Sequence, residues 1–171
     1  LRRVLLPLWN AYSFFVTYAN EAGWSLDTRD DTPKHPLDRW ITAEVQDLVN
    51  RMTEQLDRYD LSATCAELHE TVDALTDWYV RLSRRRFAGK SVVRGTVTDA
   101  NVLDKDQQSA FETLYEVLLT VSKLLAPFCP FITEAIYLNL TDDEHGSIHL
   151  TDWPPVRELT EEEQQLLHET R

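Results

Sequence analysis

Glycine, cysteine and methionine are scarce in this chain of 171 residues, and each shortage excludes something. With 4 glycines and 7 prolines, the sequence lacks the frequent turn residues of a loop-rich β architecture. The 2 cysteines, Cys65 and Cys129, stand far apart and lack the paired spacing of a metal site. We therefore expect two buried free thiols in a reducing compartment.

Long apolar runs and positive charge are also lacking. No run reaches the ~18 apolar residues that a membrane span requires, and no signal-peptide pattern is found. Lysine and arginine number 17 against 29 aspartate and glutamate residues, so the net charge is −12. Averaged over the chain, that balance argues against nucleic acid as a partner. We expect a cytoplasmic protein with no membrane partner and, because the chain begins at Leu1 instead of methionine, a part of a longer one.

Apolar residues recur at helical spacing along most of the chain, which predicts an all-α fold. We expect four long helices and a shorter fifth, at about residues 5–19, 38–59, 61–86, 107–126 and 130–140. The first is apolar on most of its faces, as a central helix is. The turn between the second and third is so short that these two should be antiparallel neighbours. The predicted fold is an antiparallel helix bundle.

The third helical segment has the most regular apolar pattern. Its stripe advances in alternating steps of four and three residues, as in the seam of a helical bundle. The stripe consists of Leu61, Cys65, Leu68, Val72, Leu75, Tyr79 and Leu82. Asp60 is placed to cap this helix, and Asp38 to cap the second. These features predict one continuous helix that buries the whole stripe.

The chain after residue 140 differs in kind from the helical segments before it. Residues 147–150 could form a short strand, and Trp153 precedes a turn-forming pair of prolines. Thr160 and Glu163 have the spacing of a capping box for a last helix. We therefore expect a helical bundle over residues 1–140 and a strand, turn and helix appendage over 141–171 that packs on it.

Residues 81–94 hold six basic side chains and no acidic one. The six are Arg81, Arg84, Arg85, Arg86, Lys90 and Arg94. Removing their six positive charges from a net charge of −12 leaves −18 on the rest of the chain. Positive charge is therefore concentrated at one helix end and the loop after it, which favours a binding site for phosphate groups.

Two structural explanations compete with phosphate binding. Cations near the C-terminus of a helix complement its macrodipole, but this accounts for one or two of the six. The acidic segments 142–144 and 161–163 could instead pair with the arginines, and the cluster would then be structural. Both alternatives are open at the level of the sequence.

Trp78 and Asn10 are two further candidate binding residues. Trp78 precedes the basic cluster and could stack on an unpaired base, or it could be buried beside Tyr79 on the core stripe. Asn10 lies within the apolar first helix, where its amide needs a partner. It could cap a neighbouring helix or point outward to read a base edge.

The sequence contains no recognisable catalytic or metal constellation. It has no Ser–His–Asp or Cys–His set, no P-loop and no Rossmann glycine pattern. His145 and His149 are four residues apart but have no cysteine near them. We expect no catalytic residue, no metal and no cofactor in this chain.

Five segments of the sequence resemble the isoleucyl-tRNA synthetases, a family of class I aminoacyl-tRNA synthetases. The start of the anticodon-binding domain of that family is similar to LLPLWNAYSFF at residues 5–15. Its second helix begins like DRWI at 38–41, and its third ends like DWYVRLSRRRF at 77–87. Its fourth helix and the exit from it resemble LYEVL and LLAPFCPFITE within 114–134, and the segment that follows resembles SIHLTDWP at 147–154.

The resemblance implies the anticodon-binding domain of a multidomain isoleucine ligase. The implied partners are the tRNA(Ile) anticodon stem-loop and the catalytic and editing domains of the parent chain, a monomeric enzyme. ATP and magnesium would bind in the catalytic domain, with zinc as a further candidate for the parent. The arginine cluster then becomes an RNA site, with Asn10 and Trp78 near splayed anticodon bases.

Two departures and two rivals accompany this resemblance. The loop at Gly89–Asp106 is longer than is usual in the family. Family members commonly have a tryptophan directly after the Arg-Arg-Arg-Phe run, where this chain has Ala88. The same domain of a valyl- or leucyl-tRNA synthetase is one rival. The other is a helical protein-interaction module without RNA binding, which predicts that the arginines pair with carboxylates.

Overall fold

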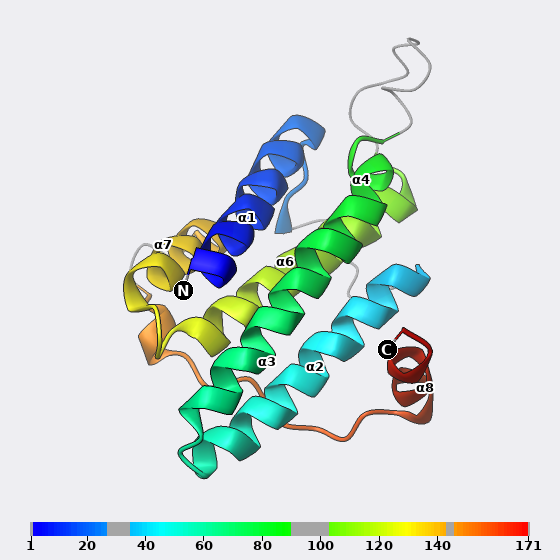
Figure 1. The fold of residues 1–171 in the computed structure, drawn as a ribbon. Helices are drawn as coiled ribbons and strands as arrows, with labels where there is room; N and C mark the ends of the chain where they lie inside the picture. The colour runs from blue at the N-terminus through cyan, green and yellow to red at the C-terminus, as the bar shows by residue number, and fades with distance from the viewer. Residues whose placement is uncertain (1, 27–34, 90–102, 143–145, 171) are drawn as a thin grey trace.

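The computed structural model describes residues 2–26, 35–89, 103–142 and 146–170, and these form an all-α bundle (Figure 1). The helices of the bundle are α1 (Arg2–Ala22), α2 (Pro36–Asp57), α3 (Leu61–Asp73), η2 (Ala74–Val80), α4 (Arg81–Phe87), α6 (Lys105–Leu125) and α7 (Pro130–Thr141). A single 3₁₀ turn, η3 (Ile148–Leu150), and a last helix, α8 (Glu161–Thr170), follow. This confirms the predicted fold class.

The long axis of the bundle is a rod made of α3, η2 and α4, which continue one another (Figure 1). Helix α2 runs antiparallel beside α3 after a short turn, as predicted, and α6 contacts both α2 and α4. Helix α1 lies along α3 and η2, α7 leaves the end of α6, and α8 contacts α2. No helix among the described residues is long and apolar enough to cross a membrane.

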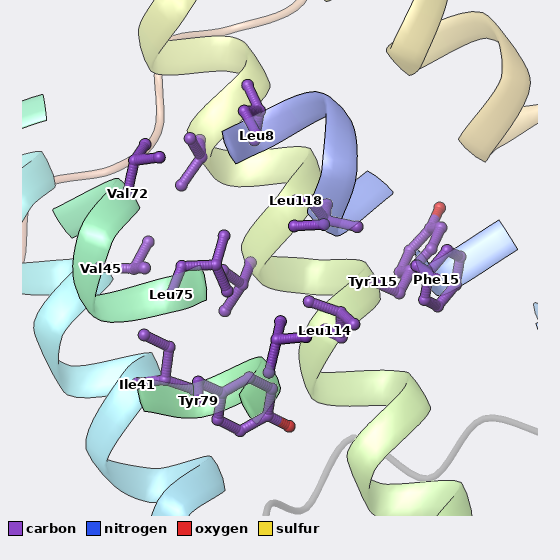
Figure 2. Close-up of a cluster of buried hydrophobic side chains, with 14 of the residues drawn as sticks. Leu8, Phe15, Ile41, Val45, Val72, Leu75, Tyr79, Leu114, Tyr115 and Leu118 are labelled. Carbon is purple, nitrogen blue, oxygen red and sulfur yellow. The ribbon is translucent and has the colours of Figure 1, made fainter. Parts of the chain in front are cut away.

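The core lies where α1, α2, the α3–η2 rod and α6 meet (Figure 2). Its central side chains are fully or almost fully buried and come from all four elements: Leu8, Ile41, Val45, Val72, Leu75, Leu114 and Leu118. Burial of each such side chain contributes about 1.5–3 kcal/mol to stability. The apolar stripes predicted from the sequence therefore pack together in one hydrophobic core.

The N-terminal caps of α2 and α3 were predicted from the same rule, and one prediction was wrong. Asp60 caps α3 as expected, since its carboxylate accepts a hydrogen bond from the Ala63 N–H at 3.0 Å. Helix α2 instead begins at Pro36, and its cap is His35, whose Nδ1 accepts from the Leu37 N–H at 3.1 Å. Asp38 lies one turn inside, where it has a different role.

The rod is not a regular α-helix, because η2 has π-helical hydrogen bonding over seven residues. A π turn is wider than an α turn, so the apolar face rotates relative to the sequence pattern. Val80, Ser83 and Phe87 point inward after it, while Leu82 is 51% exposed. The prediction that the whole stripe is buried was therefore wrong at Leu82, and also at Leu61 and Cys65, which are exposed at the other end of the rod.

We predict that Leu82→Ala changes the free energy of unfolding by no more than about 0.5 kcal/mol, because Leu82 lies outside the core. Urea unfolding followed by circular dichroism measures the change. A loss of about 2–5 kcal/mol, the range for buried leucines, would place Leu82 in the core and contradict the rotation caused by η2.

Residues 153–157, between η3 and α8, run along α2 and form hydrogen bonds with its side chains. Asn50 donates to the Arg157 carbonyl at 2.8 Å, Gln46 to the Pro155 carbonyl at 3.1 Å, and the Trp153 indole to the Thr53 hydroxyl at 2.9 Å. These bonds lead the chain along α2 to α8. The division of the chain at residue 140 stays a prediction.

Two sequence-based predictions on the C-terminal part of the chain had different outcomes. The capping box is confirmed: the Thr160 N–H donates to Glu163 at 2.8 Å, and the Glu163 N–H donates to the Thr160 hydroxyl at 3.2 Å. The short strand at 147–150 was wrong, because these residues form the turn η3. They have no neighbouring strand among the described residues, and an isolated strand leaves its backbone groups unpaired.

Glu163 predicts a pH-dependent contribution to stability. Hydrogen bonds from the Arg157 guanidinium, at 2.7 and 2.8 Å, together with the capping bonds, lower the pKa of Glu163 to about 2. This pKa lies below the ordinary value near 4.5. The ionised Glu163 therefore contributes fully to the stability of the fold above pH 4.5, and this contribution is lost as the pH falls toward 2. We expect Glu163→Gln to cost about 0.5–1 kcal/mol at pH 7 and progressively less in acid. Urea unfolding of both proteins between pH 7 and 3 tests this, and a pH-independent difference would contradict it.

Candidate nucleic-acid interface

The predicted basic cluster begins on α4, which contains four arginines and no acidic residue. Arg81, Arg84 and Arg85 are exposed. Arg81 donates a hydrogen bond from Nε to the Asp77 carbonyl at 2.7 Å. The side chains of Arg84 and Arg85 have no hydrogen bond or ion pair to another of the described residues. Three guanidinium groups are therefore presented to solvent without a compensating carboxylate in the described part of the chain.

Helix α4 ends at a defined place because of Gly89 and Gln107. Gly89 has a φ of +66°, the left-handed conformation that closes helix ends and suits glycine. An added Cβ there would lie 3.0 Å from the Gln107 side chain, which itself donates to the Phe87 carbonyl at 3.0 Å. The start of α6 thus fixes the end of α4, where the exposed arginines lie.

Arg86 differs from its neighbours, because its side chain is only 8% exposed. Its two terminal nitrogens donate to both oxygens of Asp38, at 2.6 and 2.7 Å, and its Nε donates to Asp106 at 2.8 Å. The sequence-based prediction placed Arg86 with the phosphate-binding residues. The structure places it inside, as a bidentate ion pair between α4, α2 and α6.

Asp38 is the centre of a buried polar network and is 0% exposed. Besides Arg86, the Tyr79 hydroxyl donates to Oδ1 and the Ser109 hydroxyl to Oδ2, each at 2.8 Å. Burial and the Asp38 carboxylate raise the pKa of Tyr79 well above its ordinary value, so the phenol stays a neutral donor. Burial opposes the charge of Arg86, but its bonds to Asp38 outweigh this and raise its pKa. The network holds α4 against α2 and α6.

For the acidic segment 161–163, the described residues show partners other than the cluster arginines, whereas Asp143 and Glu144 of the segment 142–144 lie outside the described residues. Glu162 pairs with Arg39, and Glu163 pairs with Arg157. Arg86 is the member of the cluster on α4 that has carboxylate partners, and these are Asp38 and Asp106. Lys90 and Arg94 lie outside the described residues.

Trp78 is exposed, as the RNA-binding hypothesis requires. It lies in η2 with 56% of its surface accessible, while its neighbour Tyr79 is fully buried. The alternative that Trp78 is simply a core residue was therefore wrong. π-helical turns often occur at functional sites, and this one places an aromatic ring one turn before the exposed Arg81 and two turns before the exposed Arg85.

Asn10, the remaining candidate, lies on α1, which contacts η2. Asn10 is exposed and lies one turn before Phe14 on one face of α1. The Phe14 ring packs edge-on against Phe87 of α4, with 5.1 Å between ring centres. Since Phe14 faces α4, the exposed Asn10 lies toward the η2–α4 rod, which α1 contacts.

Trp9 is an exposed aromatic residue that sequence reasoning missed. It is 44% exposed on α1, next to Asn10, in the helix that the sequence predicts to be apolar on most of its faces. The sequence does contain a pattern that indicates the exposed side of α1, because the polar residues Asn10, Ser13 and Thr17 recur there at helical spacing. The exposed residues of α1, η2 and α4, namely Trp9, Asn10, Trp78, Arg81, Arg84 and Arg85, are together called the basic–aromatic face below.

The basic–aromatic face combines two chemistries. Guanidinium groups bind phosphate oxygens in bidentate geometry, and exposed indole rings stack on unpaired bases. In the described part of the chain, no group of three His, Cys, Asp or Glu side chains could hold a metal ion. An all-α bundle with such a face has the features of a helical RNA-recognition module.

Comparison with known protein families agrees with this class. The family model described as the anticodon-binding domain of tRNA ligase matches residues 38–170. The match covers most of the chain, and the chain therefore belongs to this family.

Similar curated proteins are isoleucine–tRNA ligases. Those of Protochlamydia amoebophila and Thermus thermophilus are each 41% identical to the chain, over 164 and 160 residues, which are 95% and 90% of it. That of Deinococcus radiodurans is 44% identical over 157 residues, or 91% of the chain. The matched regions make up 15%, 14% and 13% of these relatives, so the chain spans about one seventh of their length.

Proposed function

We propose that this chain recognises the anticodon arm of tRNA(Ile) as a domain of an isoleucine–tRNA ligase. The observation that carries the proposal is the basic–aromatic face. It presents Arg84 and Arg85, which have no partner among the described residues, beside the exposed indole of Trp78. The similarity to isoleucine ligases supports isoleucine over valine or leucine as the amino acid of the parent enzyme.

In this proposal the domain binds the anticodon arm and catalyses no reaction. Arg81, Arg84 and Arg85 bind backbone phosphates of the anticodon arm, and Lys90 and Arg94 extend this contact along the chain. Trp78 and Trp9 stack on splayed bases, and the Asn10 amide donates to or accepts from a base edge. Arg86 contributes indirectly, because its ion pair with Asp38 anchors the helix that carries the phosphate-binding arginines.

The parent enzyme attaches isoleucine to tRNA with ATP in a catalytic domain, and its editing domain hydrolyses mischarged valine; both domains lie outside this chain. ATP and magnesium bind in the catalytic domain, and zinc is a further candidate. We propose a monomeric cytoplasmic enzyme, in which binding of the anticodon arm orients the acceptor end toward the active site.

The rival interaction module is disfavoured by a specific observation. It requires the arginines to pair with carboxylates, and among the described residues Arg86 is the cluster member on α4 that does so. Arg84 and Arg85 lack such a pair among the described residues, which leaves their charge available to an anionic partner.

The test is a titration with the tRNA(Ile) anticodon stem-loop and with a stem-loop of altered anticodon, each over a series of salt concentrations. Both the 171-residue chain and the full-length ligase are titrated. We expect preference for the native anticodon, and a log–log salt slope of about −0.7 per phosphate contacted. Equal binding to both stem-loops would overturn anticodon reading. Absence of binding to the chain and to the ligase would overturn the RNA role altogether.

A further inference from the structure

Helix α7 is apolar on nearly its whole circumference. Its inward residues Thr133, Ile136 and Leu140 are buried against the bundle. A surface helix usually has a polar outer face, whereas a helix that is apolar all round is typical of the interior of a larger protein. The composition of α7 therefore indicates that more than the described bundle covers it.

The outer side of α7 carries a second apolar stripe. Phe131, Ala135 and Leu138 are spaced by four and three residues, so they lie on one face of the helix. Phe131 and Ala135 are exposed, and Leu138 is half-buried. The Phe131 side chain is 91% exposed, which is unusual for a phenylalanine in a protein that functions with this face in water.

Leu150 extends the same surface. Glu134, one turn after Phe131, accepts hydrogen bonds from the Ile148 N–H at 2.9 Å and from the Ser147 hydroxyl at 3.1 Å. These bonds attach the turn η3 to α7, and the two elements are in contact (Figure 1). Leu150, at the end of η3, is 84% exposed. The outer apolar surface consists of Phe131, Ala135, Leu138 and Leu150.

The charge of this surface points to protein and not to RNA. Helix α7 contains no lysine or arginine, and its one acidic side chain, Glu134, is engaged by η3. Nucleic acid binds surfaces that supply cations, as the basic–aromatic face does. Exposed Asn139 and Asp142 lie at the C-terminal end of this face, so it supplies no cation, while its exposed Phe131 and Leu150 fit an apolar protein surface of the kind found between permanently associated domains.

We propose that the outer apolar surface of α7 and η3 is the docking surface for another domain of the same ligase polypeptide. This rests on the part of the proposed function that makes the chain a domain of a longer ligase, and not on RNA binding. The relatives are about seven times longer than the matched region, so ample chain exists to cover this surface. Covering Phe131 and Leu150 in the same polypeptide removes an exposed apolar patch that would otherwise favour aggregation.

Hydroxyl-radical footprinting of the full-length ligase and of the 171-residue chain tests this directly. Radicals oxidise aromatic side chains according to their accessibility, and Tyr59 at the α2–α3 turn is a matched internal control at 89% exposure. We expect Phe131 to be oxidised at least about tenfold more slowly in the ligase than in the chain, with Tyr59 changed less than twofold. Equal oxidation of Phe131 in both proteins overturns the proposal.

A pair of variants distinguishes another domain of the ligase from two other partners that could cover this surface, a second copy of the chain and RNA. Phe131→Asp is expected to lower the melting temperature of the full-length ligase, and Tyr59→Asp is expected to leave it unchanged. If the isolated chain instead forms a dimer that Phe131→Asp dissolves in sedimentation experiments, the occupant is a second copy and the proposal fails. If Phe131→Asp weakens stem-loop binding without changing the melting temperature, the surface binds RNA and the proposal also fails. If the arginine variants lose stem-loop binding and Phe131→Asp does not, the result concerns the proposed RNA-binding function and leaves the docking proposal unaffected.

Discussion

Asp38→Ala is expected to lower the free energy of unfolding by about 3–5 kcal/mol, the range for breaking a buried ion pair by removing one partner. The reason is that Arg86 would keep its charge while losing the two carboxylate oxygens that accept its hydrogen bonds at 2.6 and 2.7 Å. Tyr79 and Ser109 would lose the same acceptor. Urea unfolding of both proteins at pH 7, followed by circular dichroism, gives the difference.

Asp47→Ala is the matched control for this experiment. Asp47 also lies on α2 and pairs with an arginine, Arg51, but this pair is partly exposed, so we expect a loss of no more than about 1 kcal/mol. The combined change Asp38→Leu with Arg86→Met should recover much of the stability, because it removes both buried charges together. A loss below about 1 kcal/mol for Asp38→Ala would contradict the role of the buried network.

Replacing Arg84 and Arg85 together by alanine is expected to weaken binding of the tRNA(Ile) anticodon stem-loop by about 10- to 100-fold. Each lost contact between a guanidinium and a phosphate costs about 1 kcal/mol, and a factor of ten corresponds to about 1.4 kcal/mol. The log–log salt slope should become shallower by about 1.4, which is two phosphate contacts at about 0.7 each. Helicity and urea stability should stay unchanged, because both side chains are exposed and unpaired among the described residues.

A double variant of Arg3 and Arg58 to alanine controls for net charge. Both are exposed arginines away from α4, and Arg58 lies at the turn before the opposite end of the rod. We expect this variant to weaken binding less than threefold with nearly the same salt slope. Equal losses in the two double variants would indicate general attraction to RNA, and no loss in either would remove Arg84 and Arg85 from the binding site.

Arg86 does not belong in that experiment, although the sequence places it beside Arg84 and Arg85. An Arg86→Ala variant would combine any change in RNA affinity with the loss of a buried ion pair. Binding data on Arg86 therefore require a parallel measurement of stability, whereas data on Arg84 and Arg85 can be interpreted directly.

The sequence by itself determined the helices, their order and the family. Helical periodicity depends on neighbours three and four residues apart, and the caps at Asp60 and Thr160 depend on residues equally close in the chain. Such local rules operate before any tertiary contact forms. The motifs that carry the family resemblance are likewise contiguous, so they could be recognised without a structure.

The tertiary structure alone decided which charged and aromatic side chains are buried beside the apolar stripes, and thereby which residues are available to RNA. Arg84, Arg85 and Arg86 are identical in the sequence, but only Arg86 meets a buried carboxylate, and that carboxylate is 48 residues away. The π turn in η2 exposes Trp78 and Leu82, although the sequence pattern predicts an uninterrupted α-helix with Leu82 in the core. Both outcomes depend on how α2, α4 and α6 pack, which no local pattern in one helix specifies.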